Sequence, residues 1–103
     1  MTDLEITRLC AEAMGLLERR YGKNDEVSWV VPGEYDPLHD DAQAMALEDW
    51  LAERGTVVFE YGHYCHFDFT NQDGETTHLP CANREQRRRC AVECVAKMQL
   101  QEG

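Results

Sequence analysis

The sequence lacks a long apolar run, since no stretch approaches the ~20 residues that a membrane-spanning helix requires. Its first residues, Met1-Thr2-Asp3-Leu4-Glu5, are acidic and polar and do not resemble a secretory signal. Motifs for phosphate binding, serine hydrolysis and zinc proteolysis are missing, and Ser28 is the only serine. We therefore predict a cytoplasmic domain, residues 1–103, that is not an enzyme and needs no cofactor.

Basic charge is also scarce. Ten Lys and Arg residues stand against twenty Asp and Glu residues, so the formal net charge is -10. Nucleic-acid binding needs a basic surface, and an anionic membrane repels a chain this acidic. The composition therefore argues against both as direct partners.

The scarcity is extreme between residues 25 and 53, which contain nine acids and no base. The nine acids are Asp25, Glu26, Glu34, Asp36, Asp40, Asp41, Glu48, Asp49 and Glu53. Because unscreened like charge destabilises a compact state, this run calls for an explanation. Three remain open: a surface for a basic partner, a solvated face that keeps the protein soluble, and metal binding by some of the acids.

Of these three explanations, a surface for a basic partner is the one that gives the acidic run a function. Carboxylates can stand where the phosphates of DNA or RNA would lie, because arginine guanidinium groups bind both. The candidate contact residues are Glu34, Tyr35, Asp36, Asp40, Asp41, Glu48 and Asp49. Tyr35, between two acids, is the preferred aromatic contact over Trp29, while the helical spacing of Trp50 favours the core.

Four arginines, Arg84, Arg87, Arg88 and Arg89, cluster at the expected start of the last helix. Basic residues oppose the helix dipole at that end. We expect them to pair with the acidic run rather than to form a second contact patch.

The alternative to a partner surface is a metal-stabilised accessory or regulatory domain that holds zinc and has no inhibitory role. The possible ligands are His63, Cys65, His78 and Cys81. Their spacing matches no standard zinc motif, and strand alternation puts neighbouring Cys65 and His66 on opposite faces. The five cysteines form an odd set that argues against a disulfide framework, and the apolar neighbours of Cys90 and Cys94 favour packing.

Hydrophobic periodicity predicts an α+β fold. We expect a first helix from the Thr2 cap to about Gly22, a short strand over 27–31, and a second helix beginning after Asp36 or Asp40 and ending at Gly55. Strict alternation over 56–70, split near Gly62, predicts a hairpin, and a third strand follows the turn at 71–74. A last helix capped by Asn83, with Ala91, Cys94, Val95 and Met98 as its inner stripe and Cys90 beside them, would complete three helices around about three antiparallel strands.

Several segments together resemble the phage ABA sandwich proteins, small proteins of tailed bacteriophages and prophages. They are Ala13-Met14-Gly15-Leu16, the run from Tyr35-Asp36-Pro37-Leu38 to Ala46-Leu47, and Arg89-Cys90-Ala91-Val92-Glu93-Cys94-Val95. The resemblance implies a phage context, where small acidic proteins such as anti-CRISPR and anti-restriction proteins block host machinery. It carries over no catalytic residue. The resulting expectation is a DNA-mimicking inhibitor, monomeric or homodimeric, that binds a basic host protein or ribonucleoprotein in the bacterial cytoplasm.

Overall fold

A computed structural model describes residues 1–60, 66–80 and 86–102, in which three helices and five antiparallel strands are found. The helices are α1 (Asp3–Ala13), α2 (Asp41–Ala52) and α3 (Arg87–Glu102). The strands are β1 (Glu18–Tyr21), β2 (Val27–Val30), β3 (Gly55–Glu60), β4 (His66–Asn71) and β5 (Thr76–Pro80). The α+β class is confirmed, with two sheets in place of one and five strands in place of about three.

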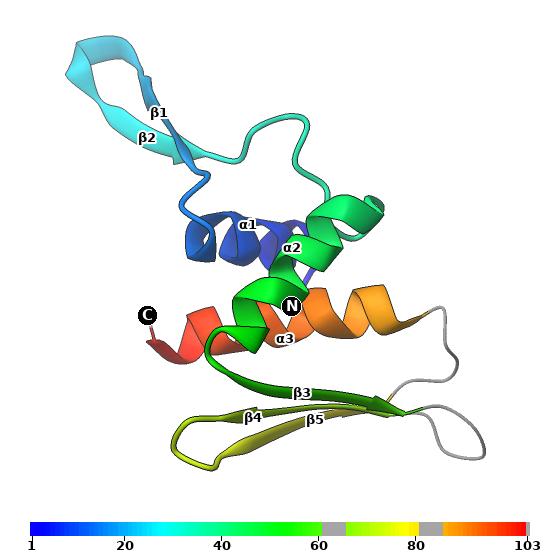
Figure 1. The fold of residues 1–103 in the computed structure, drawn as a ribbon. Helices are drawn as coiled ribbons and strands as arrows, with labels where there is room; N and C mark the ends of the chain where they lie inside the picture. Colours follow the sequence, from blue (N-terminus) through cyan, green and yellow to red (C-terminus); the bar gives the residue numbers. More distant parts are fainter. Residues whose placement is uncertain (61–65, 81–85, 103) are drawn as a thin grey trace.

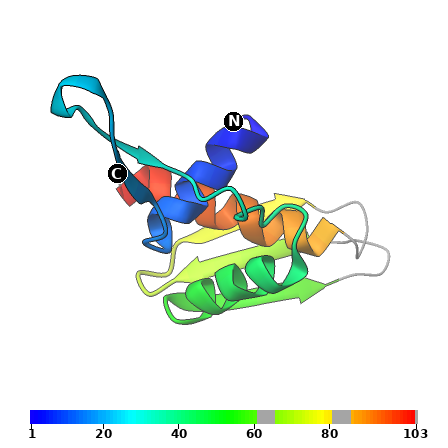
Figure 2. The same cartoon turned by 90° about the horizontal axis from the view of Figure 1, so that it is seen from above.

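Strands β3, β4 and β5 form the larger sheet, in that order. Helix α2 packs on β3, and α3 packs on β4 and β5, so both cover the same face of the sheet (Figures 1 and 2). Helix α1 packs on α3 and lies farther from the sheet. None of the helices in the described ranges is long and apolar enough to cross a bilayer.

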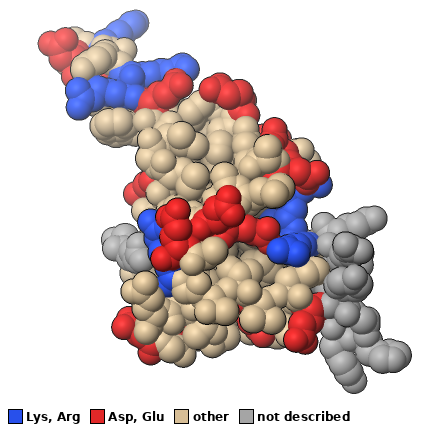
Figure 3. All heavy atoms as spheres, viewed as in Figure 1, with Lys and Arg blue, Asp and Glu red and all other residues tan. Residues whose placement is uncertain are grey.

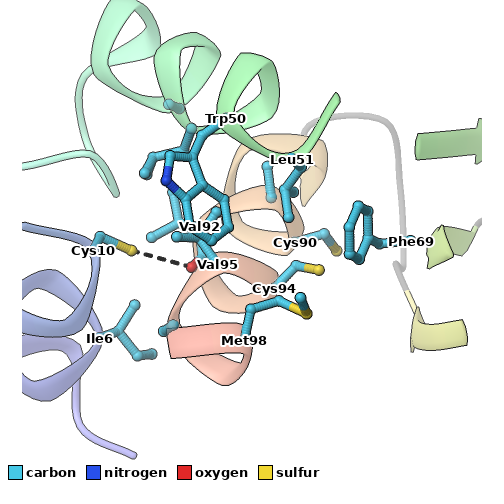
Figure 4. Close-up of a cluster of buried hydrophobic side chains, with 14 of the residues drawn as sticks. Ile6, Cys10, Trp50, Leu51, Phe69, Cys90, Val92, Cys94, Val95 and Met98 are labelled. Atoms are coloured by element: carbon cyan, nitrogen blue, oxygen red, sulfur yellow. Dashed lines mark hydrogen bonds between the residues drawn. The ribbon is translucent and has the colours of Figure 1, made fainter. Parts of the chain in front are cut away.

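The core lies between this sheet and the helices. As the alternation predicts, Phe67 and Phe69 of β4 are fully buried, and their β3 partners Phe59 and Val57 share that face. Figure 4 shows Phe69 approaching Leu51 of α2 and Cys94 of α3. The inner stripe predicted for the last helix is buried as expected: Cys90, Ala91, Cys94, Val95 and Met98.

The turn between β4 and β5 also follows the prediction. Asn71 Oδ1 accepts hydrogen bonds from the backbone N–H groups of Asp73 and Glu75, at 3.0 and 2.9 Å. Gly74 adopts a φ of 85°, which glycine tolerates without steric cost. The side chain of Asn71 thus replaces backbone partners inside the turn.

Helix α1 is shorter than predicted. The Thr2 side chain caps it by accepting from the Glu5 N–H, as expected, but it ends at Ala13 instead of near Gly22. Gly15 has a φ of 68°, and Leu16 N–H donates to the carbonyl of Ala11 at 2.8 Å. These features make a Schellman ending, in which glycine supplies the left-handed residue.

Residues 18–21, predicted to continue that helix, instead form β1, while the strand predicted over 27–31 is confirmed as β2. Strand β1 pairs with β2, and Arg19 lies opposite Trp29. The connection uses positive φ values at Asn24 (61°) and Asp25 (60°), residue types that tolerate this conformation. Figure 1 shows the hairpin projecting from the rest of the molecule.

Gly55 also differs from its predicted role as the glycine that ends α2. The helix closes at Ala52 with Glu53 in right-handed conformation, and Gly55 begins β3. A Cβ atom there would lie 2.1 Å from the backbone oxygen of Thr70. Glycine is therefore required by the close approach of β3 to β4.

The described cysteines are buried. Cys10 and Cys94 are free thiols, and Cys10 Sγ donates to the carbonyl of Val92 at 3.3 Å. Packing is thus the role of both, as expected for Cys94. Cys90 is buried as predicted, but it is also disulfide-bonded, which departs from the expectation drawn from the odd cysteine count.

Candidate partner-binding surface

The segment from Pro32 to Asp40 alternates between buried anchors and exposed acids. Pro32, Tyr35 and Pro37 point inward, while Glu34 and Asp36 are exposed. Tyr35, predicted as an interface residue, is only 8% exposed, so little of its side chain is open to a partner. Its ring is large and apolar enough to anchor the segment, and its burial directs the flanking acids outward.

Gln43 of α2 fixes this segment in place. Its Oε1 accepts from the Asp36 N–H at 2.6 Å, and its Nε2 donates to the Glu34 carbonyl at 2.9 Å. Sequence reasoning missed this residue, because a single glutamine carries no pattern. Both predicted contact acids are therefore attached to a backbone that is hydrogen-bonded to the helix.

Asp40 has a structural role. Its carboxylate accepts from the Gln43 N–H at 2.9 Å and caps α2. An N-terminal cap of this kind contributes about 1 kcal/mol to helix stability. The predicted choice between Asp36 and Asp40 as the cap is resolved in favour of Asp40, and Asp36 instead pairs with His39 at 3.0 Å.

Two further predicted contact acids are paired with α3. Arg87 meets Glu48 at 2.7 Å, and Arg88 meets Asp41 at 2.9 Å. The side chain of Glu48 is 22% exposed, whereas that of Asp41 is 80% exposed. These ion pairs confirm, for Arg87 and Arg88, the prediction that the arginine cluster pairs with the acidic run.

Arg89 differs from these two arginines. Arg89 bridges Asp3 of α1 and Glu93 of α3 at 3.0 and 2.8 Å. The hydrogen bond to Asp3 is the main reason that the pKa of Arg89 is raised. Arg84 lies outside the described residues.

Asp49 is exposed on α2, and no ion pair within the described ranges involves it. Figure 3 shows acidic side chains gathered over the middle of one face, where Figure 1 places α2, with basic groups on either side. Asp25 and Glu26 lie instead at the hairpin connection. The acidic run is thus divided between the hairpin, the 32–40 segment and α2.

From these positions we define the acidic surface as Glu34, Asp36, Asp41 and Asp49. Three of the four carboxylates are free of arginine and lysine partners among the described residues. Such groups can accept hydrogen bonds from guanidinium groups of another molecule.

The alternative zinc site falls largely outside what the structure describes, since His63, Cys65 and Cys81 are not described. The fourth residue, His78 on β5, makes a short hydrogen bond through Nδ1 to the carboxylate of Asp68. Within residues 1–60, 66–80 and 86–102, no group of three or more His, Cys, Asp or Glu side chains could hold a metal ion.

Comparisons with known proteins give no relative. A scan against protein-family models finds no match, and searches of curated proteins and of solved structures find none either. The class that the structure defines is therefore that of a small α+β domain, and function must be inferred from its surface.

Proposed function

We propose that this chain is a non-enzymatic binding protein that docks its acidic surface on a basic, nucleic-acid-binding host protein. The observation that carries the proposal is that the backbone of the segment bearing two of these acids is fixed to the fold. Buried Tyr35 and the two hydrogen bonds of Gln43 hold the backbone of Glu34 and Asp36, which have no arginine or lysine partner among the described residues. A segment whose backbone is already held in place loses less entropy when a partner binds.

The mechanism is occupation of a phosphate-binding surface. Arginine and lysine side chains that hold a nucleic-acid backbone would instead contact the carboxylates of this chain, so that the host complex no longer engages its substrate. The most concrete target is a CRISPR effector complex, in line with the resemblance to small phage proteins. A protein acting in this way needs no catalytic residue.

The test uses a double charge reversal, Asp36→Lys with Asp49→Lys. Among the described residues the Asp36 carboxylate pairs only with exposed His39, and Asp49 is exposed, so neither change removes a cap or an anchor. The matched control is Asp73→Lys with Glu75→Lys, which makes the same charge change at the exposed turn between β4 and β5.

Tagged protein is used to capture partners from a nuclease-treated bacterial lysate that contains a defined CRISPR effector, at low and high salt. We expect the effector to bind the native chain and the control at low salt, and to be released at high salt because charges are screened within about 8 Å at physiological ionic strength. Equal capture by the Asp36/Asp49 variant would show that the acidic surface is not the contact.

A further inference from the structure

The β1–β2 hairpin carries three large hydrophobic side chains, Tyr21, Val27 and Trp29, that are exposed to solvent. It projects from the helical layer in both ribbon views (Figures 1 and 2). All of β1 and most of β2 are exposed. A two-stranded hairpin is at best marginally stable in water, so this element gains most from a surface that covers it.

One face of the hairpin holds its large side chains. The register pairs Arg19 with Trp29 and Tyr21 with Val27, which puts all four on the same side. Tyr21, Val27 and Trp29 are 68%, 51% and 47% exposed. We call these four residues the hairpin face.

The arginine belongs to this face as well. The Arg19 guanidinium lies 5.4 Å from the Trp29 ring centre and 5.9 Å from that of Tyr21, and its Nη1 donates to Tyr21 Oη at 3.0 Å. Tryptophan, tyrosine and arginine dominate the energetics of protein interfaces. The hairpin face therefore has the composition of a binding surface and a positive charge at its centre.

The same chain contains a pocket whose lining is complementary to the hairpin face. An open pocket of about 350 Å³ lies between the base of the hairpin and α2, and its lining includes Met14, Leu16, Ala42 and Ala46. Glu34 also lines it and supplies a negative charge. An apolar pocket with one carboxylate complements an aromatic face with one guanidinium.

Charge distribution favours a second copy of the chain as the occupant. The hairpin, residues 18–30, carries three acids (Glu18, Asp25, Glu26) and three bases (Arg19, Arg20, Lys23), so the net charge of -10 resides elsewhere. Two such bodies repel each other when they meet directly. A neutral arm can approach the acidic body of another copy without that repulsion.

We propose that the hairpin face of one chain docks in the apolar pocket of a second copy, which returns the same contact. The two contacts are identical, as a two-fold symmetric dimer requires. Trp29 supplies the apolar anchor, and Arg19 meets Glu34 of the other chain. This contact shares Glu34 with the acidic surface but does not use Asp36 or Asp49, so the Trp29→Ala variant can lose dimerisation while it keeps partner binding.

Sedimentation of the full chain over a range of concentrations tests the proposal. We expect a species of twice the 11.9 kDa chain mass, persisting at high salt because screening reduces the repulsion between the two acidic bodies. Trp29→Ala should weaken dimerisation by roughly 30-fold or more, as loss of a central aromatic anchor does. Leu100→Ala, which truncates an exposed residue on α3, is the control and should leave the dimer unchanged.

A second variant keeps the test valid if Trp29→Ala unfolds the hairpin. Ala46→Arg fills the pocket and repels Arg19, whereas Ala52→Arg adds the same side chain at an exposed position of α2. We expect only Ala46→Arg to prevent dimerisation. Mixing Trp29→Ala with Ala46→Arg restores one intact contact, so the mixture should dimerise more strongly than either variant alone.

Two results would overturn the proposal. One is a monomer at every concentration. If the tryptophan fluorescence of that monomer changes when a single-stranded oligonucleotide is added, the hairpin face binds nucleic acid and not a second copy. The other is a dimer that neither Trp29→Ala nor Ala46→Arg affects. A dimer-deficient variant that still captures the basic partner would leave the proposed function standing.

Discussion

At the scale of single residues, Tyr35 shows how burial decides between two roles for an aromatic side chain. It stands between Glu34 and Asp36 in the sequence, which suggested an interface. In the fold it is an anchor, and its hydroxyl finds no hydrogen-bond partner among the described residues. Burial, together with the nearby Cys10 thiol, raises the pKa of Tyr35.

We predict that Tyr35→Phe keeps partner binding and leaves the free energy of unfolding unchanged or raised by up to about 1 kcal/mol, because it removes an unpaired buried hydroxyl. Urea unfolding and the capture experiment measure the two effects. A loss of binding without a loss of stability would return Tyr35 to the interface.

The two free thiols give the fold a dependence on alkaline pH. Burial raises the pKa of Cys10 and of Cys94 from 9.0 to about 12. Above pH 9.0 the unfolded chain loses these thiol protons while the folded chain keeps them. Folding stability is therefore full below that pH and falls as the pH rises toward 12.

The expected slope is on the order of 1 kcal/mol per pH unit for each thiol. Urea midpoints across this pH range measure it. A Cys10→Ala, Cys94→Ala double variant is less stable throughout, because each change leaves a cavity, but its slope should be shallower. An unchanged slope in the double variant would mean that other groups cause the pH dependence.

At the scale of elements, Gly15 decides where α1 ends and where the hairpin begins. Its left-handed φ of 68° places Leu16 in the Schellman hydrogen bond to Ala11. Nothing lies within 4 Å of a Cβ added at this position, so a substitution there acts through the backbone alone.

We predict that Gly15→Ala lowers the free energy of unfolding by about 1 kcal/mol, which is the cost of a left-handed conformation for a residue with a Cβ. Gly33→Ala is the matched control, because it is also uncrowded and its φ is not positive. Thermal unfolding of both variants measures the difference. Equal stability of the two would contradict the assigned role of Gly15.

The sequence predicts those elements whose signal is local and periodic. Alternation over 56–70 identified the buried face of the larger sheet, and helical spacing identified the inner stripe of α3. Strand β1 was missed, although β2 was predicted, because Leu17 continues the apolar spacing of α1 and this outweighed Gly15 as a stop signal. The run Gly22-Lys23-Asn24-Asp25 was the available signal for a turn.

The candidate site was only partly predictable for a related reason. Charge counting located the acids but could not determine which of them would pair across the fold. Glu48 and Asp41 meet α3 arginines about forty or more residues away in sequence. Those outcomes depend on tertiary packing, which no local pattern encodes.

At the scale of the whole molecule, charge is distributed unevenly between two kinds of surface. The acidic surface lies on α2 and the segment before it, while the neutral hairpin carries exposed aromatic side chains. Salt should act on them in opposite directions. It weakens association with a basic partner by screening attraction, and it favours self-association by screening repulsion.

The most direct test of the proposed function is displacement of DNA from a purified CRISPR effector ribonucleoprotein, followed by fluorescence anisotropy of a labelled target duplex. The native chain and the Asp73→Lys, Glu75→Lys control should release the DNA at low salt, and the Asp36→Lys, Asp49→Lys variant should not. If the native chain leaves the DNA bound, or if the Asp36/Asp49 variant releases it equally well, the acidic surface does not act in place of nucleic acid on that effector.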